Sequence, residues 1–204
     1  MSLLGAVAYT SIARPDALVY ISALQRFNHN PKVAHGKMLN ALTRWLHHHP
    51  KSIKYNRLTA VEAAGLRRQY HIRAASDSAF KKEEEKRHSM RGVYFIRCYG
   101  HSEAAITSSC SGRLLDFISR SQRHVTRSTF SAELFEACDA ADHGILLALM
   151  CHEIMQGPVS KEIGRRLREH GGYHMPLVLQ IDAMSVYAAV IATFIKIPAE
   201  KSLL

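Results

Sequence analysis

Three carboxylic acids, Asp77, Glu133 and Asp182, stand at positions where a folded chain can bring them together. Asp77 lies in a strand-like segment, Glu133 in the first turn of a long helical pattern, and Asp182 at the end of an apolar, strand-like run. Clustered carboxylates repel one another, and a divalent cation relieves that repulsion. Oxygen ligands favour Mg²⁺ or Mn²⁺ over zinc, and two such ions about 3.5–4 Å apart activate water and stabilise the leaving oxygen of a phosphodiester. We therefore expect these acids to bind metal and to be catalytic.

Each of the three acids also fits a structural role, and the sequence alone leaves both interpretations open. Asp77 would serve equally well at the start of a turn. Glu133 would complement the positive end of the helix dipole. Asp182 would cap a following helix. Only the coincidence of all three in a suitable order of elements favours the metal site.

Other residues with chemical potential fit structural roles better. No C-x-x-C pair occurs among the four cysteines, which argues against a zinc ribbon and a redox dithiol. His47, His48 and His49 precede Pro50, as expected of a solvated, cationic helix end. His152 and Glu153 belong to no H-E-x-x-H motif, so the pattern of a zinc protease is missing.

The elements that must position the three acids follow from the apolar pattern. We expect strands at 71–77, 92–99, 114–119 and 177–182, and helices at 132–154, 161–170 and 185–195. Hairpin strands followed by a strand–helix alternation predict an α/β fold, a mixed β-sheet with packed helices. If the first and last strands are neighbours and the long helix crosses them, the acids converge. We expect that helix to pack on the sheet through one apolar face, formed by Leu134, Cys138, Ala141, Ile145 and Leu149.

The N-terminal part of the chain has a helical pattern of apolar residues and no strand-like segment. Helical periodicity runs through residues 1–49 and is interrupted at Asn30-Pro31, because proline disfavours the helical conformation of the residue before it. This pattern predicts an N-terminal helical hairpin, with Lys37 and Arg44 on a basic side. We accordingly divide the chain into a helical segment at 1–55, a polar linker at 56–69 and an α/β domain at 70–204.

The composition indicates a polyanionic partner. The 27 Lys and Arg residues exceed the 17 Asp and Glu residues, for a formal net charge of +10, and such an excess favours binding to nucleic acid. The N-terminal segment lacks the pattern of a signal peptide, and no apolar run is long enough to span a membrane. We therefore expect an intracellular protein of the cytoplasm or nucleus, neither secreted nor membrane-bound.

Several short motifs, in order, resemble the Pol polyprotein of copia-type retrotransposons. The family patterns are R-P-D-I and R-F-…-N-P at the end of its reverse transcriptase, then S-D-A-D-W, R-K-S-T-S-G, S-K-K-Q…S-S-T-E-A-E-Y and D-N-Q-S-A. The corresponding segments of this chain are Arg14-Pro15-Asp16, Phe27 to Pro31, Ser76 to Phe80, Arg87 to Gly92, Ser119 to Gln122 with Ser128 to Glu133, and Ile181 to Ser185.

This resemblance implies the C-terminal end of a reverse transcriptase followed by an RNase H-like domain. Such a domain cleaves the RNA strand of an RNA–DNA hybrid with Mg²⁺ or Mn²⁺. Asp77, Glu133 and Asp182 match three of the family's acids, and the remainder of the polyprotein is an implied partner. The chain departs from the family where Phe80 replaces Trp and Ser131 replaces the first Glu of T-E-A-E-Y.

Three functional hypotheses remain open at this point. The first hypothesis is an RNase H-like nuclease that cleaves RNA–DNA hybrids. The family's fourth acid lies after the next strand or turn, so we expect this domain to be truncated at its C-terminal end and impaired in cleavage. The second hypothesis is a catalytically inactive, nucleic-acid-binding remnant of a decayed element. The third is an unrelated nuclease or integrase-like module with the same carboxylate core.

Overall fold

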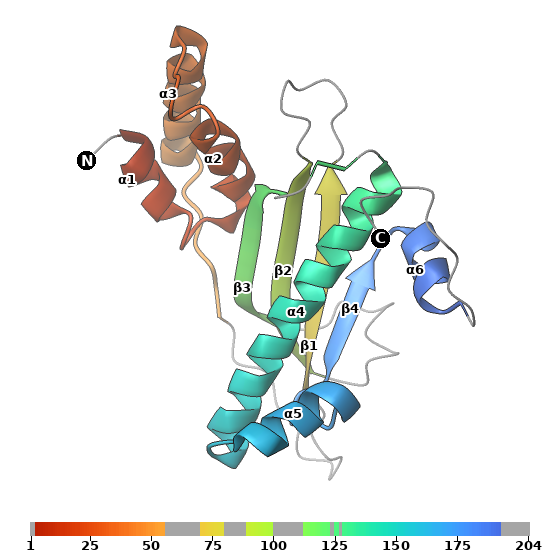
Figure 1. The fold of residues 1–204 in the computed structure, drawn as a ribbon. Coiled ribbons are helices and arrows are strands. Elements are labelled where there is room, and N and C mark those ends of the chain that lie inside the picture. The colour runs from red at the N-terminus through yellow and green to blue at the C-terminus, as the bar shows by residue number, and fades with distance from the viewer. Residues whose placement is uncertain are drawn as a thin grey trace.

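The fold centres on a four-stranded mixed sheet. The computed structural model describes residues 3–55, 70–79, 89–99, 112–122, 125–126 and 128–192. In the sheet order β3-β2-β1-β4, the antiparallel strands β1 (Tyr70–Ala79), β2 (Met90–Tyr99) and β3 (Gly112–Ser121) precede the short β4 (Leu177–Ile181). β4 pairs in parallel with β1. The predicted α/β class with a mixed sheet is therefore confirmed, and strands one and four are neighbours (Figure 1).

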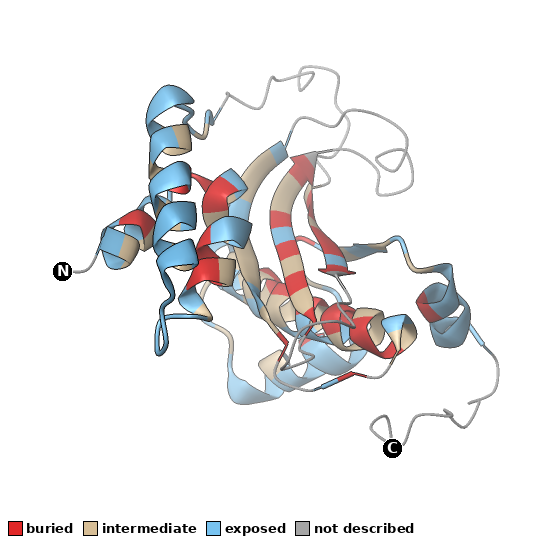
Figure 2. Ribbon diagram, turned by 90° about the horizontal axis from the view of Figure 1, so that it is seen from above, coloured by how far each residue is buried: buried red, intermediate tan, exposed pale blue. Residues whose placement is uncertain are grey.

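The helix α4 (Thr129–Gln156) crosses the sheet and forms the core with it. Ile72 and Ala74 of β1, with Phe95 of β2, pack against Ala140 and Ala148 of α4. The Ser128 side chain accepts a hydrogen bond from the backbone N–H of Ser131 at the start of α4. Figure 2 shows buried residues on the central strands, on α4 and on the N-terminal helices. Two further helices follow, α5 (Lys161–His170) and α6 (Met184–Val190).

The predicted packing face of α4 was wrong by one position. Its buried residues include Ala137, Ala140, Gly144 and Ala148, each one position before a residue of the predicted face. Cys138 is exposed instead. The physical reason is close approach: small side chains let the helix backbone lie near the sheet, and the larger apolar residues flank the contact.

The N-terminal helices pack around a core of their own. They are α1 (Leu3–Thr10), the short 3₁₀ helix η1 (Pro15–Ala17), α2 (Leu18–Gln25) and α3 (Val33–His48). The buried hydrophobic residues of this core are Val7, Ala17, Ile21, Leu24 and Leu42. α2 is tied to the sheet where the Ser22 hydroxyl donates a hydrogen bond of 2.6 Å to the carbonyl oxygen of Ser119 in β3.

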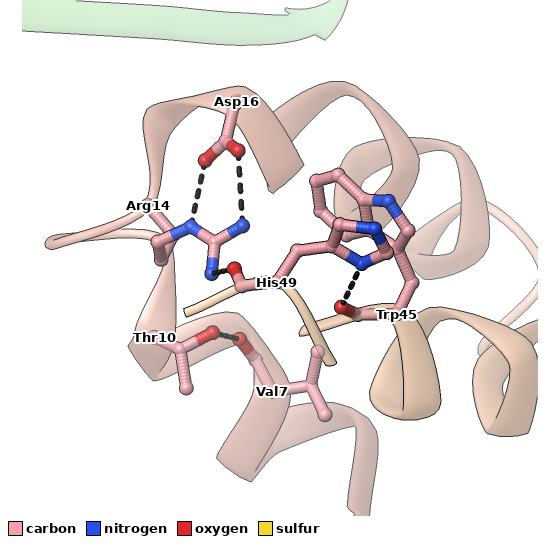
Figure 3. A network of polar contacts seen from close by, with 6 residues as sticks. All are labelled: Val7, Thr10, Arg14, Asp16, Trp45 and His49. Atoms are coloured by element: carbon pink, nitrogen blue, oxygen red, sulfur yellow. Dashed lines mark hydrogen bonds and ion pairs between the residues drawn. The ribbon is translucent and has the colours of Figure 1, made fainter. Parts of the chain in front are cut away.

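A buried arginine holds the N-terminal helices together (Figure 3). The Arg14 side chain donates from Nε and Nη2 to the two carboxylate oxygens of Asp16, at 2.9 and 3.0 Å. Its Nη1 donates to the carbonyl oxygen of His49 at 2.8 Å, and the guanidinium lies 5.2 Å from the centre of the Trp45 ring. The Arg14-Pro15-Asp16 motif therefore joins the start of η1 to the end of α3.

Several expectations fall partly or wholly on residues outside the described ranges. These are the linker at 56–69, Phe80, the first two residues of the Arg87 to Gly92 motif, and residues 193–204 of the α/β domain. Within the described ranges, no helix is both long enough and apolar enough to cross a membrane.

The close approach of α4 to β4 gives a first testable prediction. A Cβ added at Gly144 would lie 2.6, 2.7 and 3.3 Å from Cδ1, Cδ2 and Cγ of Leu177, so rotating one methyl group does not clear the space. We expect Gly144→Val to lower the free energy of unfolding by about 1–3 kcal/mol, the usual cost of overpacking. Urea denaturation measures this difference.

Gly164 in α5 provides the matched control. A Cβ there meets only Cγ1 of Val159, at 3.7 Å, which is an ordinary contact. Gly164→Ala should therefore raise the free energy of unfolding by about 0.5–1 kcal/mol through helix propensity. Equal stability changes in the two variants would contradict the packing described here.

Candidate metal centre

The three predicted acids meet at one end of the sheet. One carboxylate oxygen from each of Asp77, Glu133 and Asp182 can be chosen so that the three atoms all lie within 4.8 Å of one another. Asp77 and Asp182 are exposed, and Glu133 is half-buried. The cluster, called the acidic triad below, unites residues that are far apart in the sequence.

Strand register explains why the two aspartates are close. Ser76 of β1 pairs with Ile181 of β4 in the parallel ladder, so Asp77 and Asp182 each follow one member of the last pair. Carboxyl ends of neighbouring parallel strands lie at the same edge of a sheet. Asp77 is exposed between the buried Ser76 and Ser78, because alternate side chains of a strand point to opposite faces.

The long helix supplies the third carboxylate. α4 begins beside the carboxyl end of β1 (Figure 1), and Glu133 lies in its first turns. The small Ala132 preceding Glu133 is fully buried, which allows the helix to begin close to the strand. Glu133 therefore reaches the edge of the sheet where Asp77 and Asp182 lie.

The negative charges of Asp77 and Asp182 act on the carboxyl group of Glu133. Burial, and after it the neighbouring carboxylates of Asp182 and Asp77, raise the pKa of Glu133 to about 7. A hydrogen bond involving the Ser78 backbone opposes this shift. A divalent cation among the three groups would favour their charged forms, so the residues present fit a metal ion with oxygen ligands.

Glu136, one helical turn after Glu133, is a residue that the sequence patterns did not single out. Its side chain is fully buried, and neither carboxylate oxygen has a hydrogen-bond partner among the described residues. Its pKa is raised to about 7, mainly by burial; Arg91 and Arg120 oppose this shift, and the carboxylates of Glu133 and Asp77 add to it. The sequence spacing could have singled it out, because residues three positions apart, such as Glu133 and Glu136, lie on the same side of a helix.

The remaining polar candidates have structural partners. Asp139 and Asp142 are exposed, and Asp139 also forms an ion pair with Arg91. His143 lies 2.8 Å from a carboxylate oxygen of Asp116. His152 accepts a hydrogen bond of 3.0 Å from the backbone N–H of His174. None of these residues belongs to the acidic triad.

Comparisons with known proteins do not identify the chain. A scan against models of protein families, a search of curated protein sequences and a search of solved structures each found no match. The features of the chain that bear on its function are therefore the geometry of the acidic triad and the sequence motifs.

The raised pKa of Glu133 predicts how metal affinity depends on pH. The pKa is 4.5 ordinarily and about 7 in the fold, so between these values the metal-free native state holds a proton that the unfolded chain has released. The free energy of unfolding therefore falls as pH rises through this window. A bound metal must displace the proton, so affinity for Mn²⁺ should rise about tenfold per pH unit up to about pH 7 and then level off.

Isothermal titration calorimetry with Mn²⁺ from about pH 5.5 to 8.5 measures this profile. A Glu133→Gln variant is the control, because it has no proton to release at this position and its profile should be flatter. Equal Mn²⁺ affinity of the unsubstituted protein at pH 6 and pH 8 would count against the role of Glu133.

Charge repulsion within the triad predicts opposite effects of one substitution with and without metal. Asp182→Asn removes a negative charge beside Glu133, so the metal-free melting temperature at pH 8 should rise. The same change removes a metal ligand, so the stabilisation by saturating Mn²⁺, about 5 °C or more in the unsubstituted protein, should shrink.

Asp142→Asn is the matched control for this experiment. Asp142 is an exposed acid of α4 that lies outside the triad. The substitution should change neither the metal-free melting temperature nor the Mn²⁺ shift by a comparable amount. Identical behaviour of the two variants would show that the triad holds no metal.

Proposed function

We propose that the α/β domain is a retrotransposon-derived, RNase H-like nuclease of the copia type. Its substrate would be the RNA strand of an RNA–DNA hybrid, hydrolysed with Mg²⁺ or Mn²⁺. The observation that carries the proposal is the convergence of Asp77, Glu133 and Asp182 within 4.8 Å of one another. The match of all three to the acids of the family's motifs supports the same assignment.

The arrangement of the elements adds support. The acids come from the first strand, the start of the long helix and the end of the fourth strand, and the sheet order β3-β2-β1-β4 makes the two strands neighbours. An acid that only begins a turn or caps a helix does not need to lie near other acids. Separate structural roles for the three acids therefore do not explain why their carboxylates, which repel one another, lie together at one edge of the sheet.

Each acid of the triad would have its own role in the reaction. Asp77 and Asp182 are exposed and accessible to a phosphodiester, and both would hold metal. Glu133 is half-buried and would hold metal from the helix side, with its proton released on binding. The metal ions, when bound, supply an activated water and stabilise the leaving oxygen.

The N-terminal helices would be the end of the reverse transcriptase. The Arg14-Pro15-Asp16 motif and the segment Phe27–Pro31 carry this part of the resemblance. In this proposal residues 1–55 belong to the polymerase side, 56–69 link the two parts, and 70–204 form the nuclease domain. The rest of the polyprotein would be the protein partner.

A second candidate is a nucleic-acid-binding domain without efficient turnover. The triad contains three acids among the described residues, whereas the resemblance implies four. Fewer carboxylates hold a second metal ion less firmly, but binding depends on distributed Lys and Arg contacts to phosphates. The net charge of +10 favours such binding in either case.

A labelled RNA–DNA hybrid incubated with Mg²⁺ or Mn²⁺ separates the two candidates. We expect the hybrid to bind and cleavage to be slow and dependent on metal. Asp77→Asn should abolish the cleavage, because Asp77 holds metal, while Asp142→Asn should leave it unchanged. Gel analysis of the RNA strand measures the rate, and fluorescence anisotropy measures the binding.

The salt dependence of binding provides an independent readout. Affinity for the hybrid should fall steeply as salt rises, because each neutralised phosphate releases its counterion. Binding without any metal-dependent cleavage would favour the inactive candidate. Failure to bind the hybrid even at low salt would refute both.

A further inference from the structure

A groove lined by Asp77, one member of the acidic triad, lies over the open face of the sheet, the face opposite α4. Asp77 lines its start, Tyr94 and Phe117 line its floor, and Leu18 and Val19 of the N-terminal helices line its far wall. Its volume is about 470 Å³, within the range of about 300–1,000 Å³ that is typical of sites for small organic groups.

The register of the sheet connects this groove directly to the triad. Asp77 pairs with Gly92 across β1 and β2, and Gly92 pairs with Ser119 in β3. The next row on the same face contains Tyr94, which pairs with Phe117. Diagonal neighbours in adjacent strands lie about 7–8 Å apart, so a group bound beside Tyr94 is a close neighbour of one bound at Asp77.

The lining residues of the groove suit a flat, largely apolar ligand. Most of its lining residues are aliphatic or aromatic, and Asp77, Arg91 and Ser119 are the polar exceptions. Tyr94 and Val19 are each 48% exposed, so their side chains are accessible to a ligand. Nucleobases stack on such aromatic side chains with little preference for sequence, because every base has a π-face.

We infer that this groove binds an unpaired nucleotide of the nucleic acid strand whose phosphate lies at the acidic triad. The inference rests on the proposed function, since it places a phosphodiester at Asp77. The continuity of the groove with the triad and the net charge of +10 favour a nucleic acid strand over a peptide. A paired base is already stacked within its duplex, so the nucleotide bound in the groove belongs to a single-stranded extension of the hybrid.

Gly92 is a lining residue of the groove at which a larger side chain can be placed. A Cβ built there has the backbone oxygen of Asp77 as its nearest neighbour, at 3.9 Å, which is an ordinary contact. A larger side chain at this position is therefore compatible with the strand but occupies the space between the triad and Tyr94. Gly92→Leu should close the groove, and Tyr94→Ala should remove its stacking surface.

The experiment measures the binding of three hybrids to the full 204-residue chain. One hybrid is blunt, and each of the other two carries a single-stranded extension of about four nucleotides, a site size found in strand-binding proteins. Fluorescence anisotropy in Ca²⁺ gives the affinity for each, with the extension placed on either strand in turn. We expect one extension to raise the affinity about tenfold, the scale of a single stacked base.

The ratio of the two affinities is the readout in each variant. It should fall from about ten to about one in Tyr94→Ala and in Gly92→Leu. It should stay near ten in Tyr9→Ala, which removes a tyrosine that is 76% exposed on α1 and outside the groove. Tyr94→Ala keeps the test decisive if Gly92→Leu folds poorly, because Tyr94 is half-exposed.

The remaining outcomes test nucleotide binding in the groove independently of hybrid cleavage. No gain from any extension, or an equal gain in Tyr94→Ala, would overturn the groove while leaving hybrid cleavage intact. Binding of the single strand alone, lost in Tyr94→Ala, would support the groove even if no hybrid is cleaved. A change of oligomeric state in Gly92→Leu, measured by sedimentation, would assign the groove to a second copy of the chain and overturn the inference.

Discussion

Parallel pairing of β1 with β4 beneath α4 is the constraint on which the candidate site depends. β1 is the central strand that pairs with both β2 and β4, and its register with β4 places Asp77 and Asp182 at the same edge. α4 lies close to these strands because Ala137, Ala140 and Gly144 are small. A bulkier face would lift the helix and carry Glu133 away from the two aspartates.

The same close packing makes the triad costly without a cation. Glu133 is partly buried beside two other carboxylates, so its pKa is about 7 rather than 4.5. Glu136 adds a second acid, fully buried, whose pKa is also about 7. Proteins commonly tolerate such groupings where a bound ion or a buried arginine balances them. Arg91 and Arg120 lower the pKa of Glu136, and a divalent cation would provide the balance at the triad.

The N-terminal helices take part in the same architecture. Arg14 links η1 to the end of α3 through Asp16 and the backbone of His49, and Ser22 ties α2 to β3. These contacts hold Leu18 and Val19 over the open face of the sheet, where they form one wall of the groove. The two parts of the chain thus contribute to one continuous surface that begins at Asp77.

The sequence by itself determined the elements, their order and the three acids, because strand and helix periodicities and short motifs are local properties of the chain. It could not determine the packing face of α4: apolar residues flank the contact on both sides, and only the close approach to Leu177 selects Gly144 and its small neighbours. It also missed Glu136, whose burial follows from that rotation of the helix. The meeting of Asp77, Glu133 and Asp182 was decided by tertiary structure, because strand order and register depend on contacts between residues that are distant in the chain.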